Sequence, residues 1–414
     1  MNHQNHCTQQ PIVITGWGVC CATGDNATQL WNSASEGRPQ ARWLKIPRHG
    51  GGYFPGCVVQ SPAMTEADER LARQAGRAAR LALAAARQAW RHANLETANI
   101  PGERLGILVG TSRGPMDSWL EHAGKSQANA RIRATSATAT AIASLSGLLS
   151  LAFHAKGPCL TLSASCASSA AAIAIAAQEL IAGAADVVLA GGAEASLQPA
   201  LLAQMDAAGL LGRAEKPEAV CRPFDSARNG TVVGEGAAFL VLERLDDARR
   251  RGAHCHARLA GWSVGAEAGS RAGLEQSGTE LARVIHEALK IAGISLEDIG
   301  YINAHGAGTV QGDRMEARAL EKVFNRHLKR IPCSSTKPVT GHCLGATAAI
   351  EAIICLLAME HGTIPPTANL QQPEADCPLW LPQKAIPMPG LSAALSTSAG
   401  LWGNLAALIF SKVD

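Results

Sequence analysis

Short apolar runs alternate along the chain with longer segments that show helical patterns of Ala, Leu and Ile. The apolar runs predict buried strands, which in the first part of the chain lie at 11–19, 105–110, 159–164, 186–192 and 237–243. A second series of strands is expected at 257–265, 300–304 and 331–336, followed by a strand–turn–strand at 393–411. Helices are expected at 65–95, 139–154, 167–182, 276–292, 314–326 and 344–361. Loops are expected at 38–63 and between the 186–192 strand and about residue 230.

The regular alternation of strand and helix predicts an α/β layered fold with mainly parallel strands. A faint internal repeat adds to this picture. The eight residues from Cys166 and the eight from Cys343 share Cys, Ala, Ala and Ile at matching positions, and each set opens a long apolar helix. Such a match can arise by chance in a chain rich in alanine. If the repeat is real, the chain has two similar halves whose corresponding helices begin near one another, which would bring Cys166 and His342 together.

The composition permits a large core built from small side chains. Hydrophobic residues make up 47% of the 414 residues and aromatic residues only 4%, which suits helices pressed closely against a sheet. The length allows two domains or one large double-layered unit. A formal net charge of +3 is too small and too diffuse to indicate nucleic-acid binding, although a local basic patch could still meet an acidic protein.

The twelve cysteines indicate neither a disulfide framework nor a metal site, because they form no CxxC pair and several lie in apolar runs. The segment MNHQNHCTQQ lacks the basic residues and the apolar core of a secretory signal. The apolar stretch from Ala141 to Phe153 is too short to span a bilayer, and the helix after Cys166 carries Gln178 and Glu179. Cys21 stands where a dinucleotide-binding GxGxxG pattern would need its third glycine after Gly16 and Gly18. We therefore expect a reduced, cytoplasmic protein without a metal, a dinucleotide site or a membrane span.

Cys166 lies in SASCASSAAAIAIAAQELIAG, at the turn between a predicted strand and the 167–182 helix. A thiol is mostly protonated at neutral pH, but the free amides and the dipole of a helix N-terminus favour the thiolate. The same amides can hold the oxyanion that forms when a thioester is attacked. The small, Ser-rich turn favours a nucleophile over the alternative of a buried structural cysteine, which is our interpretation of the other eleven.

Two histidines follow in separate glycine-bracketed loops, His305 in YINAHGAG and His342 in SSTKPVTGHCLGA. Each alone is more simply explained as a structural histidine. Together with Cys166 they indicate two neutral imidazoles that donate N–H to one developing enolate or thioester oxyanion. Lys337 is either a source of positive charge or a surface lysine, and Glu351, on an apolar helix face, needs a partner such as the Lys337 and His342 region. The acidic residues after the first loop are expected to be helix N-terminal charges and not acid–base groups: Asp313 and Glu316.

Four segments resemble the β-ketoacyl-acyl-carrier-protein synthases of the thiolase superfamily, in their elongating Cys-His-His type. These segments are SCASSAAAIAIAAQELIAGAADVVLAGGAEAS, RPFDSARNGTVVGEGAAFLVLE, YINAHGAGTVQGD and SSTKPVTGHCLGATAAIEAI. The similarity runs from Ile12 to Phe410 with order and spacing kept. Histidine in the third position of the Cys-His-His set distinguishes the chain from thiolases, which have cysteine there, and from chain-initiating synthases, which have asparagine. The nucleophile distinguishes it from chain-length-factor relatives.

The resemblance implies a reaction for the candidate residues. Cys166 would accept an acyl chain from an acyl carrier protein. His305 and His342 would promote decarboxylation of a malonyl-carrier thioester and stabilise the enolate, which attacks the acyl-cysteine to give a 3-ketoacyl product. Lys337 and Glu351 would support this site. The phosphopantetheine group arrives on the carrier protein, so no cofactor of the chain's own is expected.

The resemblance also implies a thiolase-like, five-layered αβαβα fold built from two similar halves. We place the nucleophile and the dimer interface in residues 1–255, and both catalytic histidines in residues 256–414. The dimer would be a homodimer or a heterodimer with a ketosynthase-like subunit.

The chain departs from the family pattern near the expected substrate arm. Family members usually read HGTxT where this chain has His305 followed by GAGT. Ala307 therefore lacks one hydroxyl that would contact the pantetheine arm, while Thr309 keeps the other. Thr231 occupies a position that is often aromatic in the family.

A third departure is the C-terminal loop, where the family's GFGGTN is replaced by GLWGNL from Gly400 onward. Leu401 replaces the gating phenylalanine, and the bulky Trp402 replaces a glycine. The amide of Leu401 could still complete an oxyanion hole with that of Cys166, since a backbone donor needs no particular side chain. The mobility of the loop and the shape of the acyl tunnel should differ, which favours a specialised polyketide or polyene pathway over housekeeping fatty acid synthesis.

Two other functions stay open on the sequence alone. If the altered loop has disabled turnover, the chain would be a non-condensing, chain-length-determining subunit of a heterodimeric synthase. The presence of Cys166, His305, His342 and Lys337 favours activity over this reading. A coenzyme A thiolase or acyltransferase could also use the same cysteine.

Overall fold

The computed structural model describes residues 10–269 and 275–413. The N-terminal segment that was predicted not to be a secretory signal therefore lies outside the described residues, except for Gln10. Within the described ranges, ten strands hydrogen-bond side by side in the order β11-β10-β14-β15-β9-β1-β8-β6-β4-β5. They divide at the middle of this order into two sets of five.

The first set consists of β1 (Ile12–Cys20), β4 (Leu105–Gly110), β5 (Cys159–Leu162), β6 (Val187–Glu194) and β8 (Gly236–Arg244). The second consists of β9 (Ala257–Ala266), β10 (Ile299–Asn303), β11 (Cys333–Ser334), β14 (Ala393–Ala399) and β15 (Asn404–Ser411). The two sets are joined only where β1 pairs with β9, along Ile12–Ile14 and Ala257–Leu259, as far as the described residues show.

Both sets repeat one topology. Counted outward from the junction, the pairings in β1-β8-β6-β4-β5 are antiparallel, antiparallel, parallel and parallel. The pairings in β9-β15-β14-β10-β11 follow the same sequence of directions. The chain is therefore built from two similar halves, as predicted. The predicted domain boundary between residues 255 and 256 lies immediately before β9 and remains a prediction.

The prediction of mainly parallel strands is wrong. Of the nine pairings that link the ten described strands, four are parallel and five are antiparallel. The turn between β14 and β15 spans only residues 400–403, which leaves an antiparallel pair as the one geometry available. Continuous apolar runs are typical of parallel strands because these are covered on both faces, but antiparallel strands β1 and β8 are buried on both faces here and show the same pattern.

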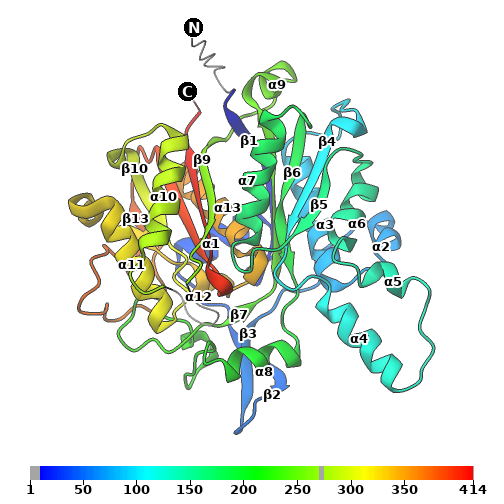
Figure 1. The fold of residues 1–414 in the computed structure, drawn as a ribbon, viewed down its shortest axis with the longest axis horizontal. Coiled ribbons are helices and arrows are strands. Elements are labelled where there is room, and N and C mark those ends of the chain that lie inside the picture. Colours follow the sequence, from blue (N-terminus) through cyan, green and yellow to red (C-terminus); the bar gives the residue numbers. More distant parts are fainter. Residues whose placement is uncertain (1–9, 270–274, 414) are drawn as a thin grey trace.

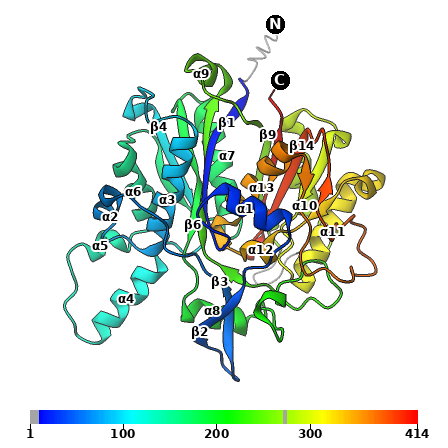
Figure 2. The same cartoon turned by 180° about the vertical axis from the view of Figure 1, so that it is seen from behind.

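Each set of five strands forms one sheet layer, and helices cover both of these sheets to give five layers (Figures 1 and 2). Helices α3 (Arg77–His92) and α6 (Ser144–Phe153) pack on the outer face of the first set of strands. Helices α10 (Thr279–Ala292) and α11 (Val310–Phe324) cover the outer face of the second set. The apolar helices α7 (Ser168–Ile181) and α13 (Thr347–His361) lie between the two sheets and form the central layer. This αβαβα arrangement agrees with the predicted fold class.

Glycines on β1 allow α3 to approach the sheet closely. A Cβ atom on Gly18 would lie 2.1 Å from the carbonyl oxygen of Ala85, and one on Gly16 would lie 2.6 Å from the backbone nitrogen of Ala93. Neither distance is possible between non-bonded atoms, so a helix can pack here only against glycine. The two glycines that resemble part of a dinucleotide motif therefore have a packing role.

Several elements lie where the sequence predicted loops or a single helix. Strands β2 (Arg42–Pro47) and β3 (Tyr53–Cys57) form a hairpin in the predicted surface loop, and β7 (Val233–Gly234) pairs with β3. Helix α4 (Met116–Gln127) and helix α8 (Pro199–Ala207) were also missed. The predicted 65–95 helix is divided into α2 (Glu66–Leu71) and α3, because the chain is extended at Gly76, the N-cap of α3.

One helical segment, Leu344–His361, has the length and the mean hydropathy of 1.5 that a membrane span would need. It is 89% buried inside the protein, because α13 is packed between the two sheets. Its apolar character is therefore accounted for by the central layer of the fold.

Candidate active site

Cys166 lies in a tight turn between β5 and α7. Ser165 adopts a left-handed backbone conformation with a φ angle of 53°, and this places the next residue at the entrance of α7. The Ser168 hydroxyl fixes the turn, because it accepts a hydrogen bond from the backbone N–H of Ala164 at 2.9 Å and lies 2.6 Å from the carbonyl oxygen of Ser165. The turn leaves the Cys166 side chain 7% exposed, at the wall of a cavity.

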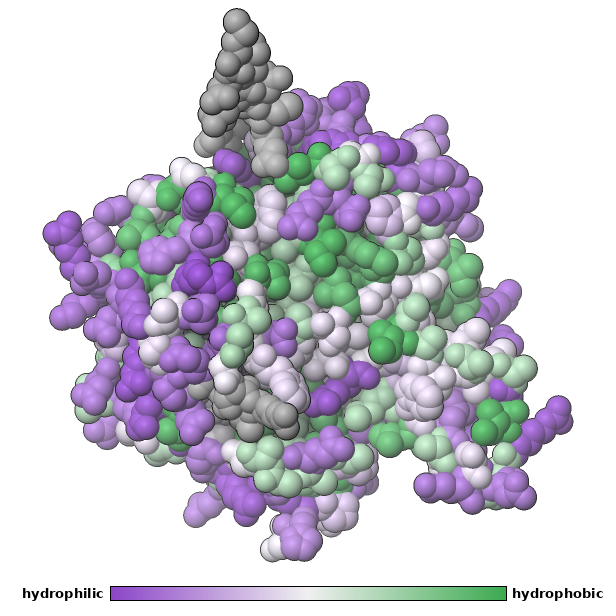
Figure 3. Space-filling view, in the orientation of Figure 1, coloured by the Kyte–Doolittle hydropathy of each residue, from purple (hydrophilic) through white to green (hydrophobic). Residues whose placement is uncertain are grey.

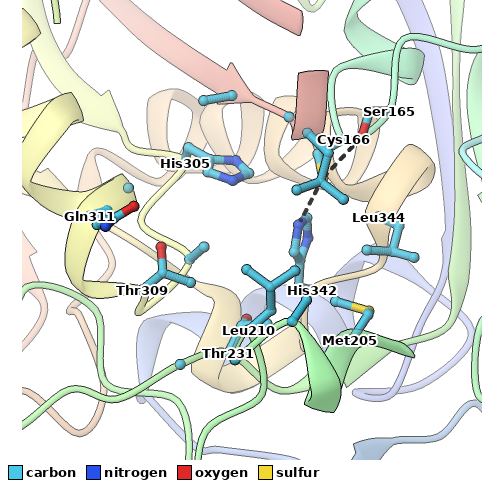
Figure 4. Close-up of a pocket in the computed structure, with 18 of the residues that line it drawn as sticks. Ser165, Cys166, Met205, Leu210, Thr231, His305, Thr309, Gln311, His342 and Leu344 are labelled. Atoms are coloured by element: carbon cyan, nitrogen blue, oxygen red, sulfur yellow. Dashed lines mark hydrogen bonds between the residues drawn. The ribbon is translucent and has the colours of Figure 1, made fainter. Parts of the chain in front are cut away.

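The imidazole of His342 contacts the thiol directly. Its Nε2 atom lies 3.1 Å from Sγ of Cys166 (Figure 4). Its Nδ1 atom lies 3.0 Å from the hydroxyl of Thr347. The backbone of His342 is held between Val232, which accepts its N–H at 2.8 Å, and Gly234, which donates to its carbonyl at 3.0 Å. A hydroxyl can donate or accept, so Thr347 supports either tautomer of His342.

His305 faces the same point from the second half of the chain. The centroids of the His305 and His342 rings are 5.2 Å apart and the ring planes are 81° apart. Figure 4 shows both rings directed toward Cys166. Nδ1 of His305 is buried and has no hydrogen-bond partner among the described residues. This nitrogen therefore has hydrogen-bonding capacity that no described residue uses.

A buried ion pair lies behind His305. The ammonium group of Lys337 is 2.5 Å from Oε1 of Glu351, and it also donates a hydrogen bond to the carbonyl oxygen of His305. Both charged side chains are fully buried, so each depends on the other. Burial raises the pKa of Glu351 to about 7, and the charge of Lys337 opposes this rise. The proposal of a surface lysine is thereby excluded.

Two acidic residues on α11 position the loop of His305. The carboxylate of Glu316 accepts the backbone N–H of His305 at 2.7 Å and that of Gly306 at 2.8 Å. Asp313 accepts the N–H of Gly308 at 3.0 Å and that of Phe224 at 2.8 Å. Both carboxylates are buried and hold the loop. Asp313 lies in the first turn of α11, as expected, but Glu316 lies beyond it, so the expectation of a helix N-terminal charge is wrong for Glu316.

A third carboxylate was missed by the sequence analysis. Glu194, at the end of β6, is fully buried and accepts the backbone N–H groups of Ser112 at 2.7 Å, Gly345 at 3.1 Å and Arg113 at 3.2 Å. It links the first half to the segment that follows His342. The available signal was a charged residue that ends an otherwise apolar strand, which requires partners if it is buried.

The Cys and His side chains line a cavity of about 370 Å³. Its inner wall includes the buried or half-buried apolar residues Met205, Leu210 and Leu344. Thr231 also lines it. So do the predicted pantetheine-binding positions, Ala307 and Thr309, and three residues of the C-terminal loop, Gly400, Leu401 and Trp402. The structure thus brings all of these predicted residues to one cavity, while Lys337 and Glu351 lie behind its wall.

The loop between β14 and β15 closes one side of the cavity. The backbone N–H of Gly400 donates to Asn404 at 2.8 Å, and that of Gly403 donates to Gly400 at 3.1 Å. A Cβ on Gly400 would lie 2.8 Å from the backbone nitrogen of Cys166, so the approach requires glycine at this position. The backbone N–H of Leu401 is directed at the thiol and lowers its pKa.

Burial dominates the electrostatics of the site. It raises the pKa of Cys166 above its ordinary value, opposed by the Ser165 hydroxyl, the charge of Lys337 and the Leu401 amide. Burial and the charge of Lys337 lower the pKa of His305 and of His342 well below 6.5. Both imidazoles are therefore neutral at physiological pH. The site combines a protonated thiol with a neutral base in contact and a second neutral ring nearby, which suits covalent acyl transfer with stabilisation of an oxyanion.

No group of three or more His, Cys, Asp or Glu side chains is arranged to hold a metal ion within residues 10–269 and 275–413. All eleven cysteines of these ranges are free thiols.

Comparison with known proteins gives consistent matches over the chain. The family model for the beta-ketoacyl synthase N-terminal domain matches residues 9–248, and that for the C-terminal domain matches residues 256–371. The chain is 35% identical to a putative polyketide beta-ketoacyl synthase 1 of Streptomyces halstedii, with 97% of each protein covered. It is 32% identical to 3-oxoacyl-[acyl-carrier-protein] synthase 2 of Coxiella burnetii, over 97% of this chain and 98% of that protein.

Solved structures show the same fold. A type II polyketide ketosynthase described in complex with its acyl carrier protein and bound to a hexaketide superposes with a TM-score of 0.89 at 30% sequence identity. The ishigamide ketosynthase/chain length factor superposes with a TM-score of 0.88, also at 30% identity. Each match covers 98% of this chain and 100% of the other.

Proposed function

The chain belongs to the β-ketoacyl synthase family, and from this premise we propose that it condenses a Cys166-bound acyl chain with a malonyl thioester carried by an acyl carrier protein. The observation that carries the proposal is the 3.1 Å contact between the Cys166 sulfur and Nε2 of His342, with a second neutral imidazole in the same cavity. The predicted activity, an acyltransferase that forms a carbon–carbon bond, needs a nucleophile and an oxyanion site together.

The first step is acylation of Cys166. His342 accepts the thiol proton, and the sulfur attacks the carbonyl carbon of the incoming acyl thioester. The N–H groups of Leu401 and Cys166 would stabilise the resulting oxyanion, a role supported by the position of the Leu401 amide next to the sulfur. The bond to the carrier sulfur then breaks, and the carrier leaves as a thiol with the proton from His342.

The second step is condensation with the malonyl thioester. Loss of carbon dioxide leaves an enolate whose oxygen accepts hydrogen bonds from the N–H groups of His305 and His342. The enolate carbon attacks the carbonyl carbon of the acyl group on Cys166. A carbon–carbon bond forms, the carbon–sulfur bond breaks, and Cys166 is released as the thiolate while the 3-ketoacyl product stays on the carrier.

Lys337 and Glu351 have a supporting role in this proposal. They touch no cavity surface, but Lys337 binds the carbonyl oxygen of His305 and lowers the pKa of both catalytic imidazoles. Because His305 and His342 stay neutral over the working pH range, their N–H groups remain available for the enolate oxygen. The pair therefore positions His305 and fixes its protonation state.

The substrates are proposed to arrive on a phosphopantetheine arm that belongs to the carrier protein, so the chain would need no cofactor of its own. Thr309 lies at the cavity wall and could donate its hydroxyl to the arm, whereas Ala307 cannot. Arg113 is exposed and lines the cavity, so its positive charge could attract the phosphodiester of the arm.

A ketosynthase-like partner is proposed to bind at the free edge of the first sheet. Strand β5 ends the strand order and has one neighbour, β4, among the described strands. Apolar side chains are exposed around it: Trp119, Ile142, Leu151 and Leu160. Figure 3 shows apolar residues gathered on this face, over β5 and between α7 and α4. An unpaired edge beside exposed apolar groups suits burial against a second subunit.

Two related structures support such an assembly. The ishigamide ketosynthase and the ketosynthase ApeO of Xenorhabdus doucetiae are both described with a chain length factor. The polyketide synthase names among the relatives also support a specialised pathway for this chain. We further propose that the protein works in the cytoplasm, which is consistent with its eleven described cysteines being free thiols.

The proposed reaction can be tested by mass spectrometry of the protein and of carrier proteins. Incubation with acyl-carrier thioesters should add the mass of the acyl group at Cys166, and later addition of malonyl-carrier should yield 3-ketoacyl-carrier and carbon dioxide. An acylated protein that transfers its acyl group without using malonyl-carrier would indicate a thiolase or simple acyltransferase. No adduct at Cys166 with any of several acyl donors would contradict the proposal.

A further inference from the structure

Trp402 has an unusual position for a large aromatic residue. Its side chain is 68% exposed, and its backbone has a φ angle of 65°, in the left-handed region that favours glycine. An exposed indole and a left-handed backbone are both unfavourable for the folded chain. Strained backbone conformations of this kind cluster at active sites and at segments that hold ligands.

Among the described residues, the hydrogen bonds that hold the loop do not use the indole. The hydrogen bonds that close the turn use the backbones of Gly400, Gly403 and Asn404 and the side-chain amide of Asn404, which donates to Leu401 at 3.0 Å. The backbone of Gly403 also accepts the N–H of Glu267 at 2.9 Å. None of these contacts involves the Trp402 side chain, and glycine would adopt its backbone conformation more easily.

The indole lies at the entrance of the catalytic cavity. Both Trp402 and the deeply placed Cys166 line the cavity, but the thiol is 7% exposed and the indole is exposed to solvent. The start of α11 also contributes exposed residues to the cavity, Val310 and Gln311. A thioester that reaches the sulfur must therefore leave the rest of its carrier group at this entrance.

We propose that Trp402 is a positioning residue that packs against the pantetheine tether of the incoming thioester. This inference rests on the proposed function. The tether contains two planar amide groups, and a flat indole face can cover such groups and exclude water from them. Once the acyl chain is on Cys166 it has left the tether, and the apolar inner wall of Met205, Leu210 and Leu344 is where it can be buried. The entrance is therefore the place for tether recognition.

Recognition of the tether has a specific kinetic consequence. The tether does not change during the reaction, so a contact with it stabilises the bound substrate and the transition state equally. Loss of such a contact raises KM and leaves kcat close to its original value. It should also affect acyl and malonyl donors alike, because both carry the same tether.

The experiment compares two sets of donors, acyl-pantetheine thioesters and acyl-N-acetylcysteamine thioesters, which keep only one amide of the tether. The measured quantity is kcat/KM for the pantetheine donors divided by kcat/KM for the N-acetylcysteamine donors. For Trp402→Ala and Trp402→Gly we expect this ratio to fall by about three- to tenfold, the range of an aromatic contact. Trp402→Phe should keep most of the ratio. Tyr53→Ala removes another exposed aromatic side chain, one outside the cavity, and serves as the control.

Two outcomes would overturn the inference. An unchanged ratio in both variants would show that the tether does not touch the indole. A ratio that falls for Trp402→Ala but not for Trp402→Gly would assign the effect to the left-handed backbone and not to the lost side chain.

A binding measurement separates this inference from the proposed reaction. Saturation-transfer NMR with pantetheine and the Cys166→Ala protein detects the tether contact without any chemistry. Weaker saturation transfer after the further change Trp402→Ala is the expected result, and equal transfer would overturn the inference. If wild-type protein forms no acyl adduct with either donor set, the proposed reaction fails, while this binding result still decides the role of Trp402.

Discussion

The sulfur of Cys166 lies 3.1 Å from Nε2 of His342, although 176 positions separate the two residues in the chain. The contact forms because α7 and α13 are equivalent helices of the two halves and lie together in the central layer. Each of the two side chains stands just before its own helix, so the packing of the two helices brings them to one point. The predictions below follow from this centre and its supports.

Replacement of the nucleophile should abolish acylation without unfolding the protein. Cys166→Ala removes a single sulfur atom at the cavity wall, so the thermal midpoint should stay close to that of the wild type. No acyl adduct should be detected by mass spectrometry. Cys159→Ala, at another cysteine of the same half, is the control and should be acylated normally. A persistent adduct in Cys166→Ala would place the nucleophile elsewhere.

The two histidines should differ in which step they support. His342 contacts the sulfur, so His342→Ala should slow both acylation and condensation. His305 makes no hydrogen bond to the sulfur, and His305→Ala should still be acylated while condensation falls by about 10²–10³-fold, the effect of losing one oxyanion donor. Single-turnover assays of the two steps separate these effects. Equal loss of acylation in both variants would refute the division of roles.

The buried ion pair predicts a strong coupling between two substitutions. Lys337→Met leaves the buried Glu351 carboxylate without its partner and should lower the free energy of unfolding by about 3–5 kcal/mol. Glu351→Met should have a similar effect for the converse reason. The double substitution should be markedly more stable than either single one, because no unpaired charge remains. Urea unfolding of the four proteins measures the coupling, and additive effects would exclude it.

The reactivity of Cys166 should rise with pH over a range that lies above that of a free cysteine. Burial raises the pKa of this thiol, so less of it is thiolate at neutral pH than in a free cysteine. Alkylation by iodoacetamide, followed at the Cys166 peptide, should therefore still increase at a pH where a free thiol has reached its plateau. The pKa of His305 and of His342 is well below 6.5, so no inflection from histidine is expected near that pH.

Removal of a hydroxyl next to the sulfur should shift the pH profile of Cys166 alkylation. The Ser165 side chain lies 3.9 Å from Sγ of Cys166 and lowers the pKa of the thiol. Ser165→Ala should therefore move the alkylation profile to higher pH. A profile that moves to lower pH, or does not move, would contradict the assigned cause.

The approach of the C-terminal loop to the nucleophile predicts a steric effect. In Gly400→Ala the new methyl group would lie 2.8 Å from the backbone nitrogen of Cys166, so the loop or the turn must shift. A shift near 1 Å at reacting groups can lower a rate by about 10²-fold, and this is the loss of acylation we expect. Gly124→Ala, at a glycine with open space around it and without a left-handed backbone, tests for general effects. Normal acylation of Gly400→Ala would show that the loop does not constrain the nucleophile.

Much of the architecture could be predicted from local patterns. The strands and the central helices lie close to their predicted positions, because apolar runs must be buried and a run of alanine and isoleucine can form a helix that is covered on all sides. The residue types around Cys166, His305 and His342 were also sufficient to select them as candidates, since glycine- and serine-rich turns mark places where side chains can reach a ligand.

Other features depend on contacts that no local pattern contains. Strand direction follows from how the chain returns to the sheet, and for this reason the prediction of parallel strands failed. Glu194 and Glu316 were not recognised as supports of the site, because their partners are backbone N–H groups distant in sequence. The hairpin of β2 and β3 is formed by a segment that looks like a polar loop until β7 pairs with it.

The sequence by itself determined which side chains could do chemistry and that the chain would form layers of helices and strands. These properties follow from the reactivity of each residue and from the burial of apolar surface, both of which are local. Only the tertiary structure decided which ring touches the sulfur, which charges are buried together, and that the indole of Trp402 stands at the entrance of the cavity. The contact between the ring and the sulfur arises when the two halves pack against each other, and none of these relationships is specified by short-range order along the chain.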